Sequence, residues 1–397
     1  MLRFVYFFLY GLLNLYAIMR TINWINNSHN TVDLRKLRVP LAIIMSLLGS
    51  TVILAFYLQR SGTHRFIPWL SSHWLGVFFY TIFYIAIADL IWLLLRLIKK
   101  DPKGLLIRSR FIFRSGLVVL ALILGTSIYG FIHMRNMKTT EYAITINKEV
   151  EGLDKMRIAL VADLHMGYTI GVKDVTKMVE KINASNPDMV VFAGDIFNNN
   201  FDALDDKDGI FAEFSKIKST YGTYACWGNH DIEEPLFSGF SVASRSEAFR
   251  DPRMDEYLEM AGFHLLEDQE MLIDNKFYVI GRLDYKKPGD GSSYRKSIEE
   301  LVARVDTEKP VILIDHQPRE FDEIAATGVD LDLSGHTHAG QIFPLNLTDG
   351  LTWENEYGLL KRGQLISIVT SGVGVYGLAM RVMTDSEVAI IDVSFEK

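Results

Sequence analysis

Five short polar clusters in the second half of the chain contain residue types that bind metal ions. They are Asp163-Leu164-His165, Gly194-Asp195, Gly228-Asn229-His230-Asp231, Asp315-His316 and Gly335-His336-Thr337-His338. Six of the ten histidines follow residue 139, and five of those six lie in these clusters, with His264 as the exception. This concentration of imidazole and carboxylate groups indicates one shared site.

Imidazole and carboxylate ligands together suit Zn, Mn or Fe. Residues i and i+2 of an extended segment face the same side, so Asp163 and His165 can bind one ion together, and His336 and His338 have the same spacing. Asp195 can use both carboxylate oxygens and bridge two ions. Two ions about 3.5–4 Å apart can clamp a phosphate and activate a water molecule.

Each cluster follows a predicted β-strand, and helical stretches alternate with the strands. Strands are expected at residues 157–161, 189–192, 223–227, 277–280, 311–314, 331–333, 365–369 and 388–393, and helices near 174–184, 212–217, 254–261 and 297–305. This is α/β patterning with much strand. Ligands of such folds lie at the carboxyl ends of the strands, which is where the clusters are.

The order of the clusters resembles the motif set of the calcineurin-like metallophosphoesterases. The resemblance covers Met156 to the C-terminus and implies a four-layer αββα sandwich. Residues 221–227 before the GNHD cluster and 339–344 after the GHTH cluster are similar to the membrane-associated bacterial branch of that family. This branch is related to UDP-diacylglucosamine hydrolases and to transmembrane proteins with a metallophosphoesterase domain.

The resemblance also implies roles for single residues. It implies two divalent ions (Mn, Zn or Fe, with Mn favoured). The first would bind Asp163, His165, Asp195 and His338, and the second Asp195, Asn229, His316 and His336. His230 would face the substrate and protonate the leaving oxygen, with Asp231 orienting it. A metal-bridging hydroxide would attack phosphorus.

The charges divide the chain into two parts. Residues 1–138 carry 16 Lys and Arg but three acids and have a net charge of +13, whereas residues 139–397 have a net charge of −20. The acidic part argues against nucleic-acid binding, which depends on Lys and Arg. The one cysteine, Cys226, excludes an intramolecular disulfide and a cysteine-based zinc cluster. We expect a transmembrane domain over 1–138 and a catalytic domain over 139–397.

Four apolar stretches in the first part approach the length of about 20 residues that crosses a bilayer. They span residues 4–19, 39–58, 74–98 and 116–134, with three spans as the main alternative. Asp89 lies within the third stretch and has no evident basic partner in the other three. An acid inside a membrane span is a candidate for function.

The basic residues predict an orientation for these spans. Eleven Lys and Arg lie in the loops after spans one and three, counting Arg20 in the first of them, and five lie on the other side. The positive-inside rule places the basic loops in the cytoplasm, so the catalytic domain is expected outside the cytoplasm, on the plasma or inner membrane.

The sequence therefore predicts an N-terminal four-helix transmembrane segment and a C-terminal α/β metallophosphoesterase domain. The expected activity is hydrolysis of a phosphoester, with a membrane lipid or lipid-linked cell-envelope compound as substrate. Two alternatives stay open: a phosphodiesterase acting on a soluble substrate, and a non-catalytic membrane sensor or transporter subunit that binds metal and phosphate.

Overall fold

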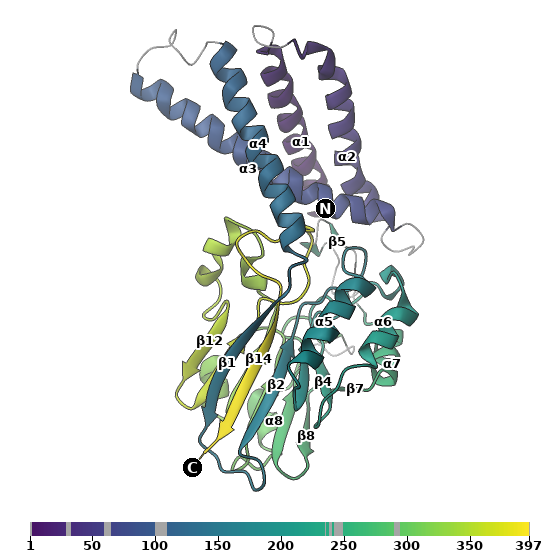
Figure 1. The fold of residues 1–397 in the computed structure, drawn as a ribbon, viewed down its shortest axis with the longest axis vertical. Coiled ribbons are helices and arrows are strands. Elements are labelled where there is room, and N and C mark those ends of the chain that lie inside the picture. Colours follow the sequence, from purple (N-terminus) through teal and green to yellow (C-terminus); the bar gives the residue numbers. More distant parts are fainter. Residues whose placement is uncertain are drawn as a thin grey trace. The chain divides into compact units, whose positions relative to one another are not determined.

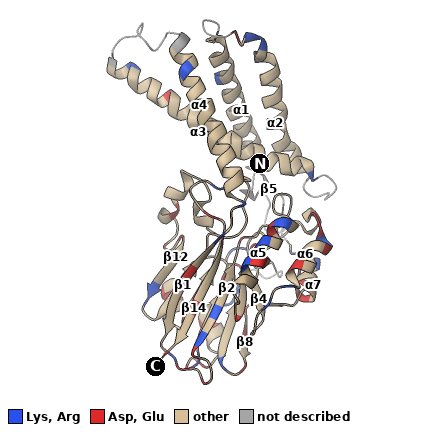
Figure 2. Ribbon diagram, viewed as in Figure 1, with Lys and Arg blue, Asp and Glu red and all other residues tan. Residues whose placement is uncertain are grey.

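The computed structural model describes residues 2–28, 33–58, 65–99, 109–234, 236–237, 240–241, 249–289 and 294–396. The chain forms two compact units. The first comprises Met1–Ile132, Pro235–Val242 and Gly377–Met380, and the second comprises His133–Glu234, Ala243–Tyr376 and Arg381–Lys397. Figure 1 shows long helices in the first unit and sheets in the second. In Figure 2, charged residues are sparse on the long helices of the first unit.

Four long helices dominate the first unit: α1 (Leu2–Asn26), α2 (Arg38–Leu58, after the short 3₁₀ helix Arg35–Leu37), α3 (Phe66–Lys99) and α4 (Ser109–His133). Each is long and apolar enough to cross a membrane, which confirms the prediction of four N-terminal apolar helices. Helices α1, α3 and α4 are longer than the predicted apolar runs, because helical hydrogen bonding continues beyond those runs at the helix ends. The short strands β5 (Leu236–Phe237) and β6 (Phe240–Ser241) pair within this unit.

Polar contacts and a close helix approach join α1, α2 and α3. The Tyr10 hydroxyl donates to the Gly49 carbonyl at 3.1 Å, and Trp74 Nε1 donates to the Tyr10 hydroxyl at 3.2 Å. A Cβ on Gly49 would lie 2.5 Å from Asn14 Oδ1, so α2 approaches the Asn14 side chain of α1 closely at this glycine. Small residues at the interface and hydrogen bonds between helices are the means by which membrane helices associate.

The expectation that Asp89 lacks a basic partner was wrong. Arg20, which the sequence placed in a loop, lies inside α1, and its guanidinium forms an ion pair with Asp89 on α3. The Tyr16 hydroxyl also donates to Asp89, at 2.5 Å. The apolar run ends at residue 19, but α1 continues to Asn26 and so includes Arg20.

The second unit contains two six-stranded sheets with the orders β1-β14-β2-β3-β4-β7 and β12-β13-β11-β10-β9-β8. Their strands are β1 (Lys138–Ile146), β2 (Lys155–Val161), β3 (Met189–Ala193), β4 (Thr223–Cys226), β7 (Phe263–Leu265), β8 (Gln269–Ile273), β9 (Phe277–Gly281), β10 (Val311–Ile314), β11 (Leu331–Ser334), β12 (Gly358–Arg362), β13 (Leu365–Val369) and β14 (Glu387–Phe395). Strands β2, β3, β4 and β7 are parallel to one another, as are β9, β10, β11 and β13. The carboxyl ends of each parallel set therefore meet at one edge.

The two sheets pack face to face and helices cover their outer faces. One apolar core combines Ile158 and Val191 of the first sheet with Ile312 and Ile368 of the second. The helices are α5 (Val172–Ala184), α6 (Lys207–Phe214), α7 (Pro252–Met260), α8 (Ile298–Val302) and α9 (Phe321–Ala325). Helices α8 and α9 pack on the second sheet, and α5 and α6 lie over the first (Figure 1). This is the expected helix–sheet–sheet–helix layering.

Several strands at the edges of the sheets were not predicted from the sequence. These are β1, β7, β8 and β12. All four are edge strands, and β7 is only three residues long. Strand β1 alternates exposed and buried residues and has no continuous apolar run, so its place depends on pairing with the distant β14.

Candidate metal centre

The five polar clusters lie in the loops that follow β2, β3, β4, β10 and β11. Backbone hydrogen bonds connect these loops. The amide of Asp163 donates to the Gly194 carbonyl at 3.0 Å, the amide of His165 donates to Asp195 O at 2.9 Å, and the amide of Gly335 donates to His316 O at 3.1 Å. The carboxyl ends of both parallel sets thereby bring the clusters together, as expected from the sequence.

The first group of metal-binding side chains consists of Asp163, His165 and His338, and all three are buried. One ligand atom from each lies within 4.8 Å of the others. His165 Nε2 is 3.1 Å from His338 Nε2, and His338 Nε2 is 3.6 Å from Asp163 Oδ1. Three ligand atoms therefore converge on one point.

The second group consists of Asp195, His316 and His336, again within 4.8 Å of one another. His316 Nε2 lies 3.2 Å from Asp195 Oδ2, 3.1 Å from His336 Nδ1 and 3.2 Å from Asn229 Oδ1. Asp195 Oδ2 is also 3.7 Å from His165 Nε2, in the first group. The Asp195 carboxylate thus lies between the two groups, as a bridging ligand must.

Hydrogen bonds within this site do not satisfy all of its buried polar atoms, and metal ions would satisfy them. Asp163 Oδ2 accepts a hydrogen bond from the amide of His336 at 2.8 Å, but the buried Oδ1 has no hydrogen-bond partner among the described residues. A buried carboxylate oxygen without a partner is costly. Oδ1 is the oxygen near His338 Nε2, so a divalent cation there would compensate the acid and use the imidazole lone pair.

The backbone carries strain at the same residues. Asp163, His165, Asp195, His336 and His338 all have φ between 49° and 73°, the left-handed region that residues with a Cβ seldom adopt. Such conformations cost about 1–3 kcal/mol each and cluster at functional sites. Five of the seven predicted ligands have a positive φ, and the backbone turns sharply at these residues after each strand.

Glycines in the motifs are required by close contacts. A Cβ on Gly335 would lie 2.4 Å from Ala162 Cβ and 2.5 Å from Asp163 Oδ2. A Cβ on Gly194, where φ is +77°, would lie 2.6 Å from His316 Nδ1. Both distances are too short for real atoms, so these glycines let the ligand loops pack against one another.

Burial sets the protonation of the candidate ligands. It lowers the pKa of His165 to about 4 and lowers the pKa of His336 and His338 well below the ordinary value. Neutral imidazole is the form that binds metal. Burial also raises the pKa of Asp163 to about 7. A bound cation opposes that shift because it stabilises the carboxylate.

The contact expected between Asp231 and His230 is replaced by a different one. The carboxylate of Asp231 accepts from the amides of Phe197 and Gly228, both at 2.7 Å. The Nδ1–H of His230 instead donates to Asn199 Oδ1 at 3.2 Å. Since two backbone amides already occupy both Asp231 oxygens, that residue shapes the loop and Asn199 orients the imidazole.

Tyr376 and Arg381 are further residues of the site that the sequence reasoning did not assign to it. The Tyr376 ring lies 4.5 Å from the His230 ring and 5.5 Å from the His165 ring, centroid to centroid. The fully buried Arg381 donates to the carbonyls of His338, Ser371 and Gly374 at 2.6–3.2 Å. A clue for Tyr376 was the glycine-rich run 372–377, which brings the backbone close to Asp163.

The loop around His316 is held by hydrogen bonds and buried ion pairs. His316 Nδ1 lies 2.9 Å from the Ala193 carbonyl, which leaves Nε2 facing Asp195. Next to it, Asp315 pairs with Arg282 at 3.3 Å and with Arg295 at 2.8 Å. Arg282 is buried and supports this loop.

Comparisons with known proteins agree with this arrangement. A family model for calcineurin-like phosphoesterases matches residues 156–340. A transmembrane protein with metallophosphoesterase domain from Danio rerio is 26% identical over 376 residues, covering 91% of this chain and 81% of that protein.

Two bacterial proteins are also similar. An uncharacterized metallophosphoesterase of Campylobacter jejuni is 28% identical over 403 residues, covering 99% of this chain and 98% of that protein. Another, from Aquifex aeolicus, is 31% identical over 280 residues, covering 69% of this chain and 97% of that protein. With its four membrane helices and converging ligands, the chain belongs to the calcineurin-like phosphoesterase family and is an integral membrane, metal-dependent phosphoester hydrolase.

Proposed function

We propose that the protein hydrolyses a phosphoester of a lipid-linked or cell-envelope substrate at a dinuclear metal site, in a catalytic domain spanning residues 139–397. The observation that carries the proposal is the presence, in one chain, of two adjoining ligand groups and four membrane helices. One helix would suffice as an anchor, so four favour a substrate that belongs to the bilayer.

The distances between the side chains support the proposed ligands. The first ion would bind Asp163, His165, Asp195 and His338, and the second Asp195, Asn229, His316 and His336. When bound, two divalent ions activate a water molecule and neutralise charge on the phosphoryl group. Mn²⁺ is our choice of metal for both positions, because nitrogen and oxygen ligands accept it and thiolates are absent from the ligand set.

His230 is the proposed catalytic residue outside the ligand set. Its amide donates to Asp195 Oδ1 at 2.7 Å, which holds the residue beside the bridging ligand. Because Nδ1–H donates to Asn199, Nε2 is the ring nitrogen left to contact the substrate. It passes a proton to the leaving oxygen when the ring is an imidazolium, in which both nitrogens carry a proton. Asp231 contributes by holding the loop that carries His230.

The direct test is hydrolysis of bis-p-nitrophenyl phosphate by the purified full-length protein with added Mn²⁺. We expect Asp195→Asn to lose metal and activity, and His230→Ala to keep bound metal but lose at least about 100-fold in kcat. Asn147→Ala, an exposed residue of the same unit, serves as control. An inactive wild type with both metal positions occupied would refute the enzyme mechanism, and full activity of Asp195→Asn would refute the ligand assignment.

A second experiment tests the substrate class. The wild type and Asp195→Asn are incubated with a total lipid extract in mixed micelles, and released phosphate and phosphorylated headgroups are identified by mass spectrometry. Release by the wild type alone supports the lipid-linked substrate. Activity on bis-p-nitrophenyl phosphate without release from any lipid favours the soluble-substrate alternative.

A further inference from the structure

Two adjoining cavities lie between α1, α3 and α4 in the membrane unit. The larger has a volume of about 650 Å³ and the smaller about 160 Å³, and both are lined by Arg20, Asp89 and Ser115. The larger falls within the range of about 300–1,000 Å³ that is usual for ligand sites. Apolar and aromatic side chains form the rest of its wall, among them Trp92, Phe111 and Leu122.

The polar end of these cavities is an ion pair. Arg20 and Asp89 contact each other and keep 39% and 31% of their side-chain surface exposed, so neither is sealed inside the helix packing. Tyr16 donates a hydrogen bond to the same Asp89 carboxylate at 2.5 Å. Charged residues within membrane helices are costly and mark binding or transport sites.

The ion pair lies near one end of the helices. Arg20 is six residues before the end of α1 and Asp89 ten residues before the end of α3, which corresponds to about 9 Å and 15 Å along the helix axes. Both residues therefore lie in the C-terminal half of their helix. Val118 and Leu122 of the cavity wall are 60% and 45% exposed, so the cavity can be reached sideways from the bilayer.

An aromatic contact between α1 and α4 borders the smaller cavity, whose lining includes Trp24. Trp24 Nε1 donates to the Phe113 carbonyl at 3.0 Å, and the two rings stack at 5.8 Å. A Cβ on Gly116 would lie 2.1 Å from the Trp24 ring, so α1 and α4 meet closely here. The wall of the smaller cavity is therefore set by specific packing.

We propose that this cavity binds a phospholipid with a phosphoethanolamine headgroup. The phosphate would contact Arg20 and the ammonium group would donate to Asp89, so both protein charges stay compensated in a medium of low dielectric. An anionic headgroup would leave Asp89 facing a like charge, and a choline headgroup has no N–H to donate. The apolar wall would hold an acyl chain. This proposal is independent of the phosphoesterase activity.

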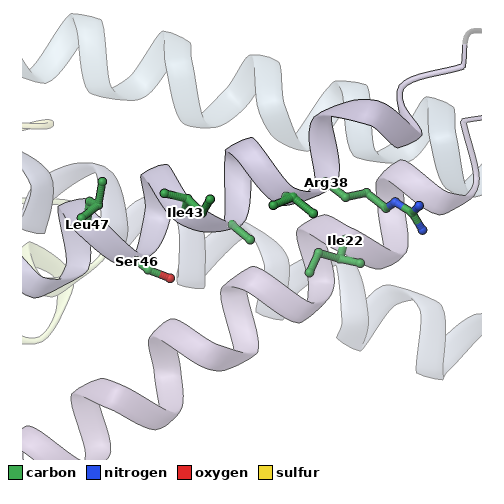
Figure 3. Close-up of a pocket in the computed structure, with 7 residues that line it drawn as sticks. Ile22, Arg38, Ile43, Ser46 and Leu47 are labelled. Carbon is green, nitrogen blue, oxygen red and sulfur yellow. The ribbon is translucent and has the colours of Figure 1, made fainter.

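A shallow groove between α1 and α2 provides the control. It is lined by Ile22, Arg38, Val39, Ala42, Ile43, Ser46 and Leu47, and Figure 3 shows the Arg38 guanidinium at one end of the apolar row. Arg38 carries the same charge as Arg20 and lies toward the same ends of the helices, but the groove has no acidic side chain in its lining. Substituting it removes one cation from this membrane face without altering the cavity.

The test is native mass spectrometry of the full-length protein in detergent, titrated with palmitoyl-oleoyl phosphatidylethanolamine, phosphatidylcholine or phosphatidylglycerol. We expect one phosphatidylethanolamine molecule to bind more tightly than either other lipid. Arg20→Gln and Asp89→Asn should each weaken its binding by about tenfold or more, the effect of losing one charge-assisted hydrogen bond. Arg38→Gln should change it less than about twofold.

Two results would overturn the proposal: equal binding of all three lipids by the wild type, or tighter binding of phosphatidylglycerol than of phosphatidylethanolamine. Unchanged binding in both single variants would also overturn it. If a single variant does not fold, the double variant Arg20→Gln/Asp89→Asn retains a hydrogen bond between the helices but neither charge. If thermal unfolding shows that this double variant is folded, we expect it to bind phosphatidylethanolamine no more tightly than the other two lipids. A retained preference would overturn the proposal.

Discussion

The imidazole of His230 is oriented by Asn199, an amide that lies 31 residues earlier in the chain. The orientation of that amide is itself fixed, because Asn199 Nδ2 donates to the Ile232 carbonyl at 2.9 Å and so turns Oδ1 toward His230. The Asn199 amide N–H also donates to the His230 carbonyl at 2.9 Å. A neutral acceptor thus selects the Nδ1–H tautomer of His230.

Asn199→Ala tests this positioning role. We expect kcat for bis-p-nitrophenyl phosphate to fall by about 10–100-fold, comparable to the loss of an outer-shell partner, because the imidazole loses its fixed orientation. Metal content, measured by elemental analysis, should stay at the wild-type value since Asn199 is not a proposed ligand. A loss of metal equal to the loss of activity would show a structural role instead, and Asn147→Ala again controls for nonspecific effects.

Asp332 on β11 gives a prediction about stability and pH. Its buried carboxylate accepts from Ser367 Oγ at 2.7 Å, and burial, reinforced by Asp315, raises its pKa to about 7. Because the unfolded-state pKa is lower, about 3.9, the folded domain binds this proton more tightly. Its contribution to stability is therefore complete below about pH 4 and is lost as the pH rises through about 7.

Asp332→Asn removes the buried charge and keeps an oxygen that can accept from Ser367. We expect it to raise the free energy of unfolding at pH 8 by about 1–3 kcal/mol, with the difference vanishing near pH 4. The measurement is urea unfolding followed by tryptophan fluorescence at both pH values, with the exposed Asp154→Asn as control. The same stabilisation at both pH values would contradict the assignment of a buried charge.

At the scale of elements, the parallel strands of two separate sheets end at one place. Strands β2, β3 and β4 deliver Asp163, Asp195 and Asn229, and strands β10 and β11 deliver His316 and His336. Each strand is followed by a sharp turn, and the turns interlock through backbone hydrogen bonds such as the one from the Gly335 amide to His316 O. The geometry of the site therefore depends on how closely the loops approach.

Gly335→Ala tests that dependence. The added methyl group would meet Ala162 Cβ and Asp163 Oδ2 within 2.5 Å, so the loop after β11 must move away from the loop after β2. We expect a loss of about 1–3 kcal/mol in unfolding free energy together with weaker metal binding. Gly350→Ala, whose Cβ would meet its nearest neighbour at an ordinary 3.5 Å, should leave metal content and stability nearly unchanged. Wild-type metal affinity in Gly335→Ala would argue against interlocked loops.

At the scale of the whole molecule, charge is divided between the two parts of the chain. The first 138 residues carry a net charge of +13. Their basic residues concentrate between α1 and α2, where Arg35 lies, and between α3 and α4, close to Arg96. We propose on this basis that those ends lie in the cytoplasm and that the catalytic domain lies outside it. The phosphoester substrate would then belong to the outer side of the membrane.

Single-cysteine labelling tests this orientation, since the chain has one native cysteine and it is buried. In a Cys226→Ala background, Glu151→Cys places an exposed thiol in the catalytic domain and Lys36→Cys places one in the 3₁₀ helix Arg35–Leu37 that precedes α2. In right-side-out vesicles, a membrane-impermeant maleimide should modify the first within minutes and the second only after permeabilisation. The reverse pattern would put the catalytic domain in the cytoplasm.

The sequence by itself determined the types of the ligands, the strands that precede them and the four apolar helices. These features are local: a strand end, a D-x-H spacing and a run of apolar residues are each visible within a short window. The helix ends were less well predicted because polar residues continue a helix past its apolar part, which is how Arg20 was placed in a loop.

Only the tertiary structure decided which distant residues meet. It paired Asn199 with His230 in place of the adjacent Asp231, joined Arg20 on α1 to Asp89 on α3, and inserted β14 between β1 and β2. None of these contacts has a local signal, because each depends on packing that brings remote segments together. Sequence spacing constrains what one segment can present, whereas the partner of each side chain is set by the fold around it.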